Sequence, residues 1–242
     1  MGSNPASPTK KKGVFMCGRF VRTFTNTDLV TELQIMESAN EGLGANWNVP
    51  PTSKIAVIGV RDSKRALRIM EWGLIPKWSK DASRQSSMIN ARVETAHEKP
   101  SFRTLIKSHR VVIPMDGFYE WDRSGEKKQP FYFHPHSQRL LCVAGLWSSW
   151  VDPTSGETRS TVAMLTTEAN SDMCDIHDRM PCLLSYGDLE TWLDPNADAI
   201  VELASLRTLA PGHLNHYRVN SRVNSVRNNG PELIEQVGSV HD

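Results

Sequence analysis

Residues 110–121 read RVVIPMDGFYEW, and they contain two short runs of apolar or alternating side chains, Arg110–Ile113 and Gly117–Trp121. Such runs are typical of β-strands that are buried on one or both faces. Three similar runs follow along the chain: Gln129–Phe133, Leu140–Leu146 and Arg159–Thr166. The segments RSG at 123–125 and DPTSG at 152–156 suit hairpin turns between them. The series predicts an antiparallel sheet that curls towards a barrel.

Two more strand-like runs, Ile55–Val60 and Ala66–Trp72, precede this region and are separated by a short polar turn. Further upstream, apolar residues recur at helical spacing and predict a helix from Asp28 to about Ser38, with Thr27 as its N-cap. The stretch NWNVPP at 46–51 predicts a loop, because proline disfavours helix in the residue before it.

The C-terminal third predicts two short helices. Ser185 with Asp188 three residues later matches a capping box, and Asn196 is the expected cap of the next helix. The tail at Asn220–Val226 is expected to be strand or loop. Residues 16–238 therefore predict one α+β domain, mostly antiparallel sheet curling into a barrel-like core with flanking helices. Residues 1–15, which are polar and rich in Pro, Ser and Lys, are expected to be a disordered leader or tag.

Composition limits the function classes. The 242 residues carry a net charge of only +1, so any nucleic-acid contact must come from a local basic patch. No apolar run approaches the ~18 residues that span a bilayer, and no signal peptide is evident. The four cysteines, Cys17, Cys142, Cys174 and Cys182, lack metal-site spacing. We expect a cytoplasmic monomer, associated with the nucleoid if the host is bacterial, that needs no metal or organic cofactor.

The stretch MCGRF at 16–20 has special chemistry if Met16 is removed. Cys17 would then carry an α-amine and a thiol on adjacent carbons, and an α-amine titrates near pH ~8, well below lysine. Such a 1,2-aminothiol can form a Schiff base with an aldehyde and close through sulfur to a five-membered thiazolidine. The ordinary alternative is that Cys17 is a small buried apolar residue.

Three other stretches set polar groups among apolar neighbours: MINARVET at 88–95 with Asn90 and Arg92, GFYEW at 117–121 with Glu120, and IHDRMP at 176–181 with His177. In an extended MINARVET segment, Asn90 and Arg92 would lie on the same side. Singly, each has an ordinary alternative: a solvent-facing carboxylate, a satisfied loop histidine, a turn asparagine or a surface arginine. Tryptophans such as Trp72 and Trp78 are more often core residues than platforms for base stacking.

Taken in order, MCGRF, INARVET, GFYEW, LTTEAN at 165–170 and IHDRMP closely resemble the SOS-response-associated peptidase family, whose members are also called abasic-site processing proteins. The resemblance runs from Met16 to about Val237. It implies an activity in which an N-terminal cysteine crosslinks to the ring-opened aldehyde of an abasic site in single-stranded DNA. The resulting thiazolidine shields the lesion and can be reversed.

Carried over to this sequence, the resemblance implies that Cys17 is the nucleophile and that Asn90 holds its α-amine. Glu120 would assist proton transfer and sugar opening, and His177 would be the acid–base group for imine formation and reversal. A glutamate among aromatic residues would have its charged form disfavoured by desolvation. The implied DNA contacts are Arg19, Arg92, Arg179, Trp72, Trp78 and Pro50. The abasic lesion, not the sequence, would be the specificity element.

The sequence departs from this pattern in its leader, because an internal Cys17 has its nitrogen in an amide. The leader could be foreign to the mature protein, with Met16 as the start, or removed by Cys17 itself, or retained in an inactive form. Two rivals to the crosslinker follow: a cysteine autopeptidase that pairs Cys17 with His177, and a non-catalytic single-stranded DNA-binding module.

Overall fold

The computed structural model describes residues 18–37, 42–207 and 210–238. Cys17 and the rest of the leader lie outside the described residues. Thirteen strands are present in these ranges: β1 (Phe20–Arg22), β2 (Asn46–Val49), β3 (Lys54–Arg61), β4 (Lys64–Trp72), β5 (Asn90–Arg92), β6 (Arg110–Met115), β7 (Gly117–Asp122), β8 (Gln129–Pro135), β9 (Leu141–Val151), β10 (Thr158–Glu168), β11 (Arg179–Pro181), β12 (Leu183–Leu184) and β13 (Leu214–Arg218).

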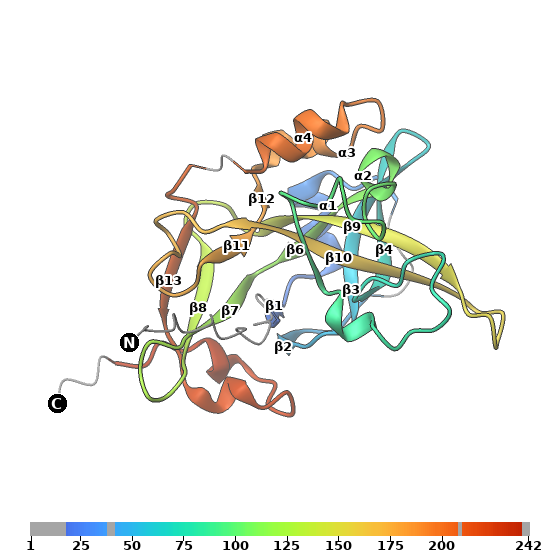
Figure 1. The fold of residues 1–242 in the computed structure, drawn as a ribbon. Coiled ribbons are helices and arrows are strands. Elements are labelled where there is room, and N and C mark those ends of the chain that lie inside the picture. The colour runs from blue at the N-terminus through green and yellow to red at the C-terminus, as the bar shows by residue number, and fades with distance from the viewer. Residues whose placement is uncertain (1–17, 38–41, 208–209, 239–242) are drawn as a thin grey trace, which may run out of the picture.

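Five of these strands close into a barrel in the order β4, β3, β6, β9, β10 (Figure 1). Four of the pairings are antiparallel, and the fifth, between β10 and β4, is parallel and joins Thr161 and Val162 to Glu71 and Trp72. The short strands β11 and β5 pair with β10, and β12 pairs with β9. The predicted α+β fold with a barrel-like sheet is confirmed, and the barrel is mixed because one closing pair is parallel.

A second sheet of five strands, in the order β13, β8, β7, β1, β2, lies beside the barrel (Figure 1). The chain passes directly from β6 of the barrel into β7 of this second sheet, with only Asp116 between the two strands. The stacked rings of Phe118 and Phe133, 5.1 Å between centroids, belong to one buried cluster with barrel residues such as Val57 and Val143. The second sheet therefore shares its core with the inside of the barrel.

Alternating side chains of the barrel strands divide between two cores, as strand geometry requires. Val111 and Ile113 of β6 face the cluster shared with the second sheet, whereas Val112 between them packs with helix residues such as Trp192. The helices cover the outside: α1 (Asn26–Leu33), α2 (Leu105–Ser108), α3 (Leu189–Leu193) and α4 (Ala199–Ser205), with 3₁₀ turns η1 (Gln85–Ser87), η2 (Tyr186–Asp188), η3 (Ser221–Asn224) and η4 (Pro231–Ile234). None of the helices in the described ranges is long and apolar enough to span a membrane.

The local predictions are mixed. The Ser185 capping box is present, with Asp188 accepting in return, and it leads into α3. Thr25 rather than Thr27 caps α1. Asp198 rather than Asn196 caps α4, because its side chain reaches two backbone N–H groups of the first turn. Two segments also differ: residues 46–49 form strand β2 instead of a loop, and the tail forms the 3₁₀ turn η3.

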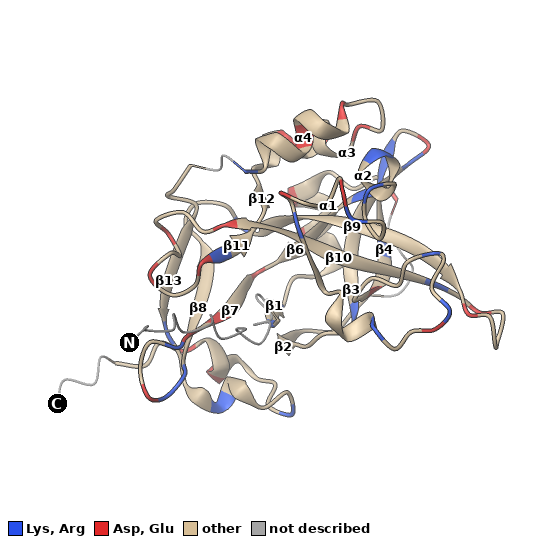
Figure 2. Cartoon of the chain, viewed as in Figure 1, with Lys and Arg blue, Asp and Glu red and all other residues tan. Residues whose placement is uncertain are grey.

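Charges of both signs are scattered over the surface elements (Figure 2). This distribution agrees with the net charge of +1. Local groupings of charge, rather than a global field, must therefore decide what the protein binds.

Candidate active site

The elements that carry Asn90, Glu120 and His177 converge on one apolar cluster. Ile89, which precedes Asn90, is buried in it, and Ile176, which precedes His177, packs against it. Glu120 lies on β7 directly opposite Phe131, which also packs against this cluster. The three predicted residues, which are 30 to 87 positions apart in the sequence, thus each lie beside a residue of this cluster or one packed against it.

Asn90 is held at the start of β5 by parallel pairing with Met164 of β10. Arg92 lies on the same side of this short strand and is exposed, while Ala91 between them is buried. The expectation from the extended pattern is therefore confirmed. The indole Nε1 of Trp72 donates to the carbonyl of Ile89, 3.0 Å away, which fixes the backbone just before Asn90.

Glu120 is the most deeply buried of the three, with 1% of its surface exposed. Its Oε1 accepts a hydrogen bond from the backbone N–H of Trp121 at 3.1 Å. The sheet pairing with β8 sets its position on the strand. A buried carboxyl group in such a setting is costly to keep charged unless hydrogen bonds or an opposite charge compensate it.

His177 lies in the loop before β11. Its Nδ1 accepts from the backbone N–H of Arg179 at 3.0 Å. The Asp178 carboxylate is also 3.0 Å from Nδ1, but it can bond only an Nδ1 that carries a proton, so the two contacts exclude each other. Asp178 is 89% exposed, and the backbone contact is the more constrained one. When Nδ1 accepts this backbone hydrogen bond, a neutral ring carries its proton on Nε2.

Arg179 anchors this loop. Its guanidinium donates to both carboxylate oxygens of Glu94, at 2.6 and 2.7 Å, and to the carbonyl of Thr166 at 2.8 Å. Burial, the largest single effect, would raise the pKa of Glu94. The hydrogen bonds from Arg179 and from the backbone, together with the positive charges of Arg179 and Arg207, outweigh it, so the pKa lies below its usual value. Arg179 is therefore committed to a bidentate ion pair in this structure.

Arg19 is tied to the C-terminal segment. It donates to Asn48 Oδ1 at 2.9 Å and to the carbonyl of Val223 at 2.8 Å, and burial lowers its pKa. The side-chain nitrogen of Asn48, which is 1% exposed, donates to three carbonyls between residues 223 and 228. Sequence reasoning missed Asn48, because its partners come 175 to 180 residues later.

The predicted aromatic contacts differ in exposure. Trp72 is fully buried and meets Phe20 edge-on at 5.3 Å, so its ring presents no surface for stacking in this structure. Trp78 is 66% exposed, and Pro50 is half-buried. Trp78 is thus the predicted tryptophan whose ring faces solvent.

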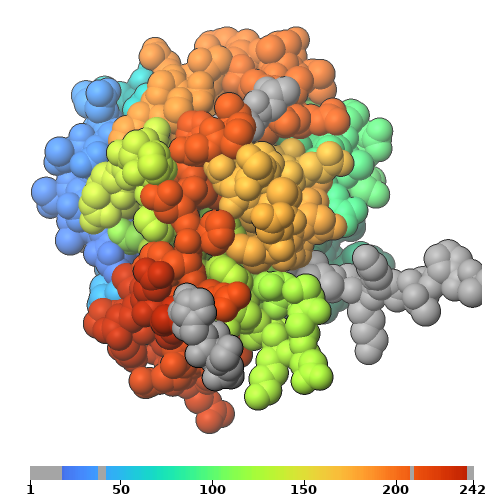
Figure 3. Space-filling view, turned by 90° about the vertical axis from the view of Figure 1, so that its left-hand side faces the viewer, coloured from blue at the N-terminus to red at the C-terminus, as the bar shows by residue number. Residues whose placement is uncertain are grey.

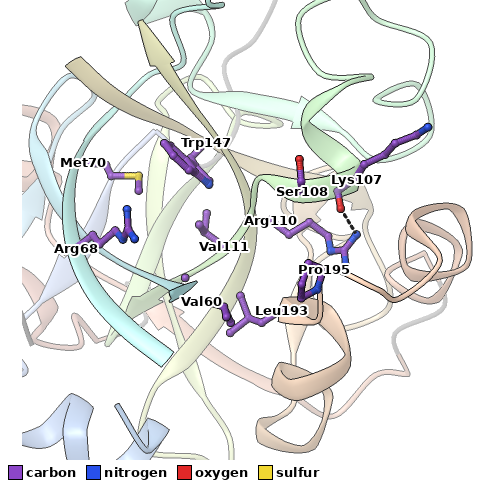
Figure 4. Close-up of a pocket in the computed structure, with 11 residues that line it drawn as sticks. Val60, Arg68, Met70, Lys107, Ser108, Arg110, Val111, Trp147, Leu193 and Pro195 are labelled. Carbon is purple, nitrogen blue, oxygen red and sulfur yellow. Dashed lines mark hydrogen bonds between the residues drawn. The ribbon is translucent and has the colours of Figure 1, made fainter. Parts of the chain in front are cut away.

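A cavity of about 110 Å³ opens at the end of the barrel where β6 begins, away from the second sheet (Figure 4). Arg68, Met70, Val111 and Trp147 are among its lining residues, and no predicted site residue lines it. Within the described ranges no group of three or more His, Cys, Asp or Glu side chains could hold a metal ion.

Comparison with known proteins shows the family of the chain. A family model described as SOS response associated peptidase (SRAP) matches residues 16–226. This chain belongs to the SRAP family. The abasic site processing protein YoqW of Bacillus subtilis (strain 168) is 40% identical over 223 residues, which is 91% of this chain and 99% of YoqW. HMCES of Xenopus tropicalis, named likewise, is 34% identical over 268 residues, covering 92% and 78% of the two chains.

Two solved structures have a similar fold. A protein from Bacteroides thetaiotaomicron superposes with a TM-score of 0.80 at 24% identity, over 91% of this chain and all of that one. A phage-related protein from Bordetella bronchiseptica gives a TM-score of 0.67 at 30% identity, over 85% and 95% of the two chains. The first likeness establishes the fold alone.

Proposed function

We propose that this protein recognises abasic sites in single-stranded DNA and forms a covalent thiazolidine crosslink with the ring-opened sugar through Cys17. The observation that carries the proposal is the near full-length match to relatives named abasic site processing proteins. The SRAP model begins to match at residue 16, directly before Cys17, which supports the choice of MCGRF as the start of the functional chain. The proposal requires that Met16 and residues 1–15 be removed, which frees the amine of Cys17.

In the proposed reaction, the Cys17 amine adds to the aldehyde carbon of the opened sugar and gives a carbinolamine. Loss of water forms an imine, and the thiol then adds to the imine carbon and closes the thiazolidine. One water is released overall, and both flanking phosphates stay attached. Reversal is the same sequence with water added back.

Asn90, Glu120 and His177 would supply positioning and proton transfer. Asn90 would accept a hydrogen bond from the Cys17 amine, and Glu120 would exchange a proton with the sugar oxygen as the ring opens. His177 would donate from Nε2 to the departing hydroxyl, since Nδ1 bonds the backbone of its own loop. General acid–base groups of this kind contribute ~10²–10⁴-fold in rate.

For the DNA contacts we propose that Arg92 and Trp78, which are exposed, face the strand directly. Arg19, Arg179, Trp72 and Pro50 would border the same path, with Arg179 and Trp72 acting chiefly by fixing the loops around the abasic sugar. Arginines on phosphates and bases on an aromatic face give affinity with little sequence preference.

The test combines protein shown by intact mass to begin at Cys17 with single-stranded DNA that carries one abasic site. We expect a protein–DNA band that survives denaturation. Cys17→Ser keeps the amine but lacks the thiol, so it should give a band only when borohydride reduces the imine. If protein confirmed to begin at Cys17 gives no stable band, the proposal is refuted. Reversible binding that is equally strong with and without the lesion would favour a plain single-stranded DNA-binding module.

A second candidate activity is removal of the leader by Cys17 itself, with His177 as its base. It is favoured by the family description as a peptidase, with a match that begins directly before Cys17. Wild type should then lose residues 1–16 while Cys17→Ala keeps them, as intact mass would report. Equal loss in both proteins would exclude self-cleavage without affecting the crosslinking proposal.

A further inference from the structure

A row of three side chains crosses the second sheet beside the candidate site. The strand register pairs Glu120 of β7 with Phe131 of β8, and Phe131 with Arg218 of β13. Directly paired residues point to the same face of a sheet. Because neighbouring strands are about 4.8 Å apart, the backbone of Arg218 lies roughly 10 Å from that of Glu120.

The outer end of this row is aromatic and basic. The Arg218 guanidinium lies over the Phe131 ring, 5.9 Å from its centroid. His216, in the neighbouring row, stacks on Phe133 at 5.0 Å and meets Phe131 edge-on at 5.7 Å. His216 and Arg218 are exposed, whereas Glu120 is buried, so the row leads from the site to the surface.

This surface adjoins the segment that carries His177. The Asp172 carboxylate accepts from the backbone N–H groups of Gly212, His213 and Leu214, which fixes the start of β13 against residues 170–178. Figure 3 shows this face, where the orange-red surface of β13 and its neighbours runs next to the gold surface of that segment. β13 is also the edge strand of the second sheet, and the C-terminal segment reaches its end, where the backbone N–H of Val237 donates to the carbonyl of Arg218 at 2.9 Å.

Arg218 is available for a ligand. Its side chain makes no hydrogen bond or ion pair with the residues that the structure describes. It lies over the Phe131 ring, and its charge interacts with the Asp122 carboxylate of β7. A guanidinium of this kind can bind a phosphate through two parallel hydrogen bonds. Aromatic faces beside it can take a base by stacking, whatever the base.

We propose that Phe131, His216 and Arg218 form a subsite for the nucleotide that adjoins the abasic residue. Arg218 contacts the phosphate of that nucleotide, and His216 with Phe131 takes its base. The subsite rests on the proposed function, because it presumes that the abasic sugar lies beside Glu120. With this subsite, the nucleotide next to the lesion contributes to the affinity for abasic DNA, whichever base it carries.

The experiment measures crosslinking against protein concentration for wild type, Arg218→Gln and the control Arg61→Gln, whose side chain is 64% exposed on the β3–β4 hairpin. Each is given a full single strand with a central abasic site and two strands that end at that site on either side. For wild type, one truncation should raise the half-maximal concentration about tenfold. On the full strand, Arg218→Gln should raise the half-maximal concentration about 3- to 10-fold. It should also lower the slope of log affinity against log salt concentration by about 0.7. The truncation that weakens wild type should cause no further increase in this variant.

The crosslinking rate at saturating protein should be unchanged in Arg218→Gln, since the residue would position DNA and not transfer protons. His216→Ala should lose affinity only when the adjoining nucleotide carries a base. An Arg218→Gln protein that behaves as wild type, or that loses the same factor on both truncated strands, would overturn the subsite. Failure of wild type to crosslink would instead refute the proposed function. The subsite would then be tested by fluorescence anisotropy, which measures the affinity of wild type and Arg218→Gln for the same full and truncated strands.

Discussion

Replacement of Arg179 by glutamine should show that this arginine holds the His177 loop in place. Breaking a fully buried ion pair costs about 3–5 kcal/mol, whereas exposed pairs contribute about 0–1 kcal/mol. The Arg179 and Glu94 side chains are 13% and 21% exposed, so the pair lies nearer the buried limit. Glutamine can keep one of the three hydrogen bonds, and we therefore expect a loss of about 2–3 kcal/mol in the free energy of unfolding.

Urea denaturation at pH 7 measures this loss, and in a domain of this size it corresponds to a fall in Tm of roughly 4–12 °C. Arg92→Gln is the matched control, because Arg92 is exposed on the neighbouring strand and should change stability by less than about 0.5 kcal/mol. In crosslinking assays both variants should lose affinity, but only Arg179→Gln should lose stability. An Arg179→Gln protein as stable as Arg92→Gln would refute the reasoning. When Arg179 is already glutamine, the further change Glu94→Gln should lower the free energy of unfolding only slightly, because the ion pair is already lost.

Three further predictions concern the rest of the chain. The hydrogen bond from Arg159, opposed by burial, lowers the pKa of Glu71, so the stability that this pair contributes should be present above the unfolded pKa of about 4.3 and be lost as pH falls through the folded value. Urea titrations from pH 7 to pH 3 should show the difference between wild type and Glu71→Gln shrinking, and a constant difference would contradict this. Gly117→Ala would place a methyl 2.4 Å from a backbone oxygen of β8, so it should lower the free energy of unfolding by at least about 1–3 kcal/mol, whereas an unchanged urea midpoint would show that the sheet can shift. In a Cys17→Ser background, iodoacetamide with peptide mapping should modify Cys174 in the folded protein, and the two buried cysteines, whose pKa burial raises, should react only after unfolding.

The sequence predicted those parts of the fold that local patterns determine. Alternating apolar residues located the barrel strands, and the Ser185–Asp188 spacing located a helix start. The same spacing, Thr25 with Asp28, was available for α1, so the expectation that Thr27 caps this helix overlooked a local signal. The parallel closure of β10 on β4 had no such signal, because its partners lie about 90 residues apart.

For the candidate site, the motifs suggested the residues, but the partners of each side chain could not be predicted from the sequence. The burial of Trp72 depends on a contact with Phe20, and the commitment of Arg179 depends on Glu94 and on a carbonyl of β10. These contacts join segments that are 13 to 85 residues apart. A residue type can suggest a phosphate contact, but only the fold shows whether its charge is already paired.

The clasp that Arg19 and Asn48 make on the carbonyls of residues 223–228 has a consequence for synthesis. A ribosome makes the strand that follows Cys17 first and the carbonyls that hold it almost last. During translation the N-terminal strand therefore lacks this clasp until nearly the whole polypeptide has emerged. A truncated chain that ends before residue 220 would keep β1 and β2 but lack the clasp, so premature termination should yield a protein in which Arg19 and Asn48 have lost these carbonyl partners.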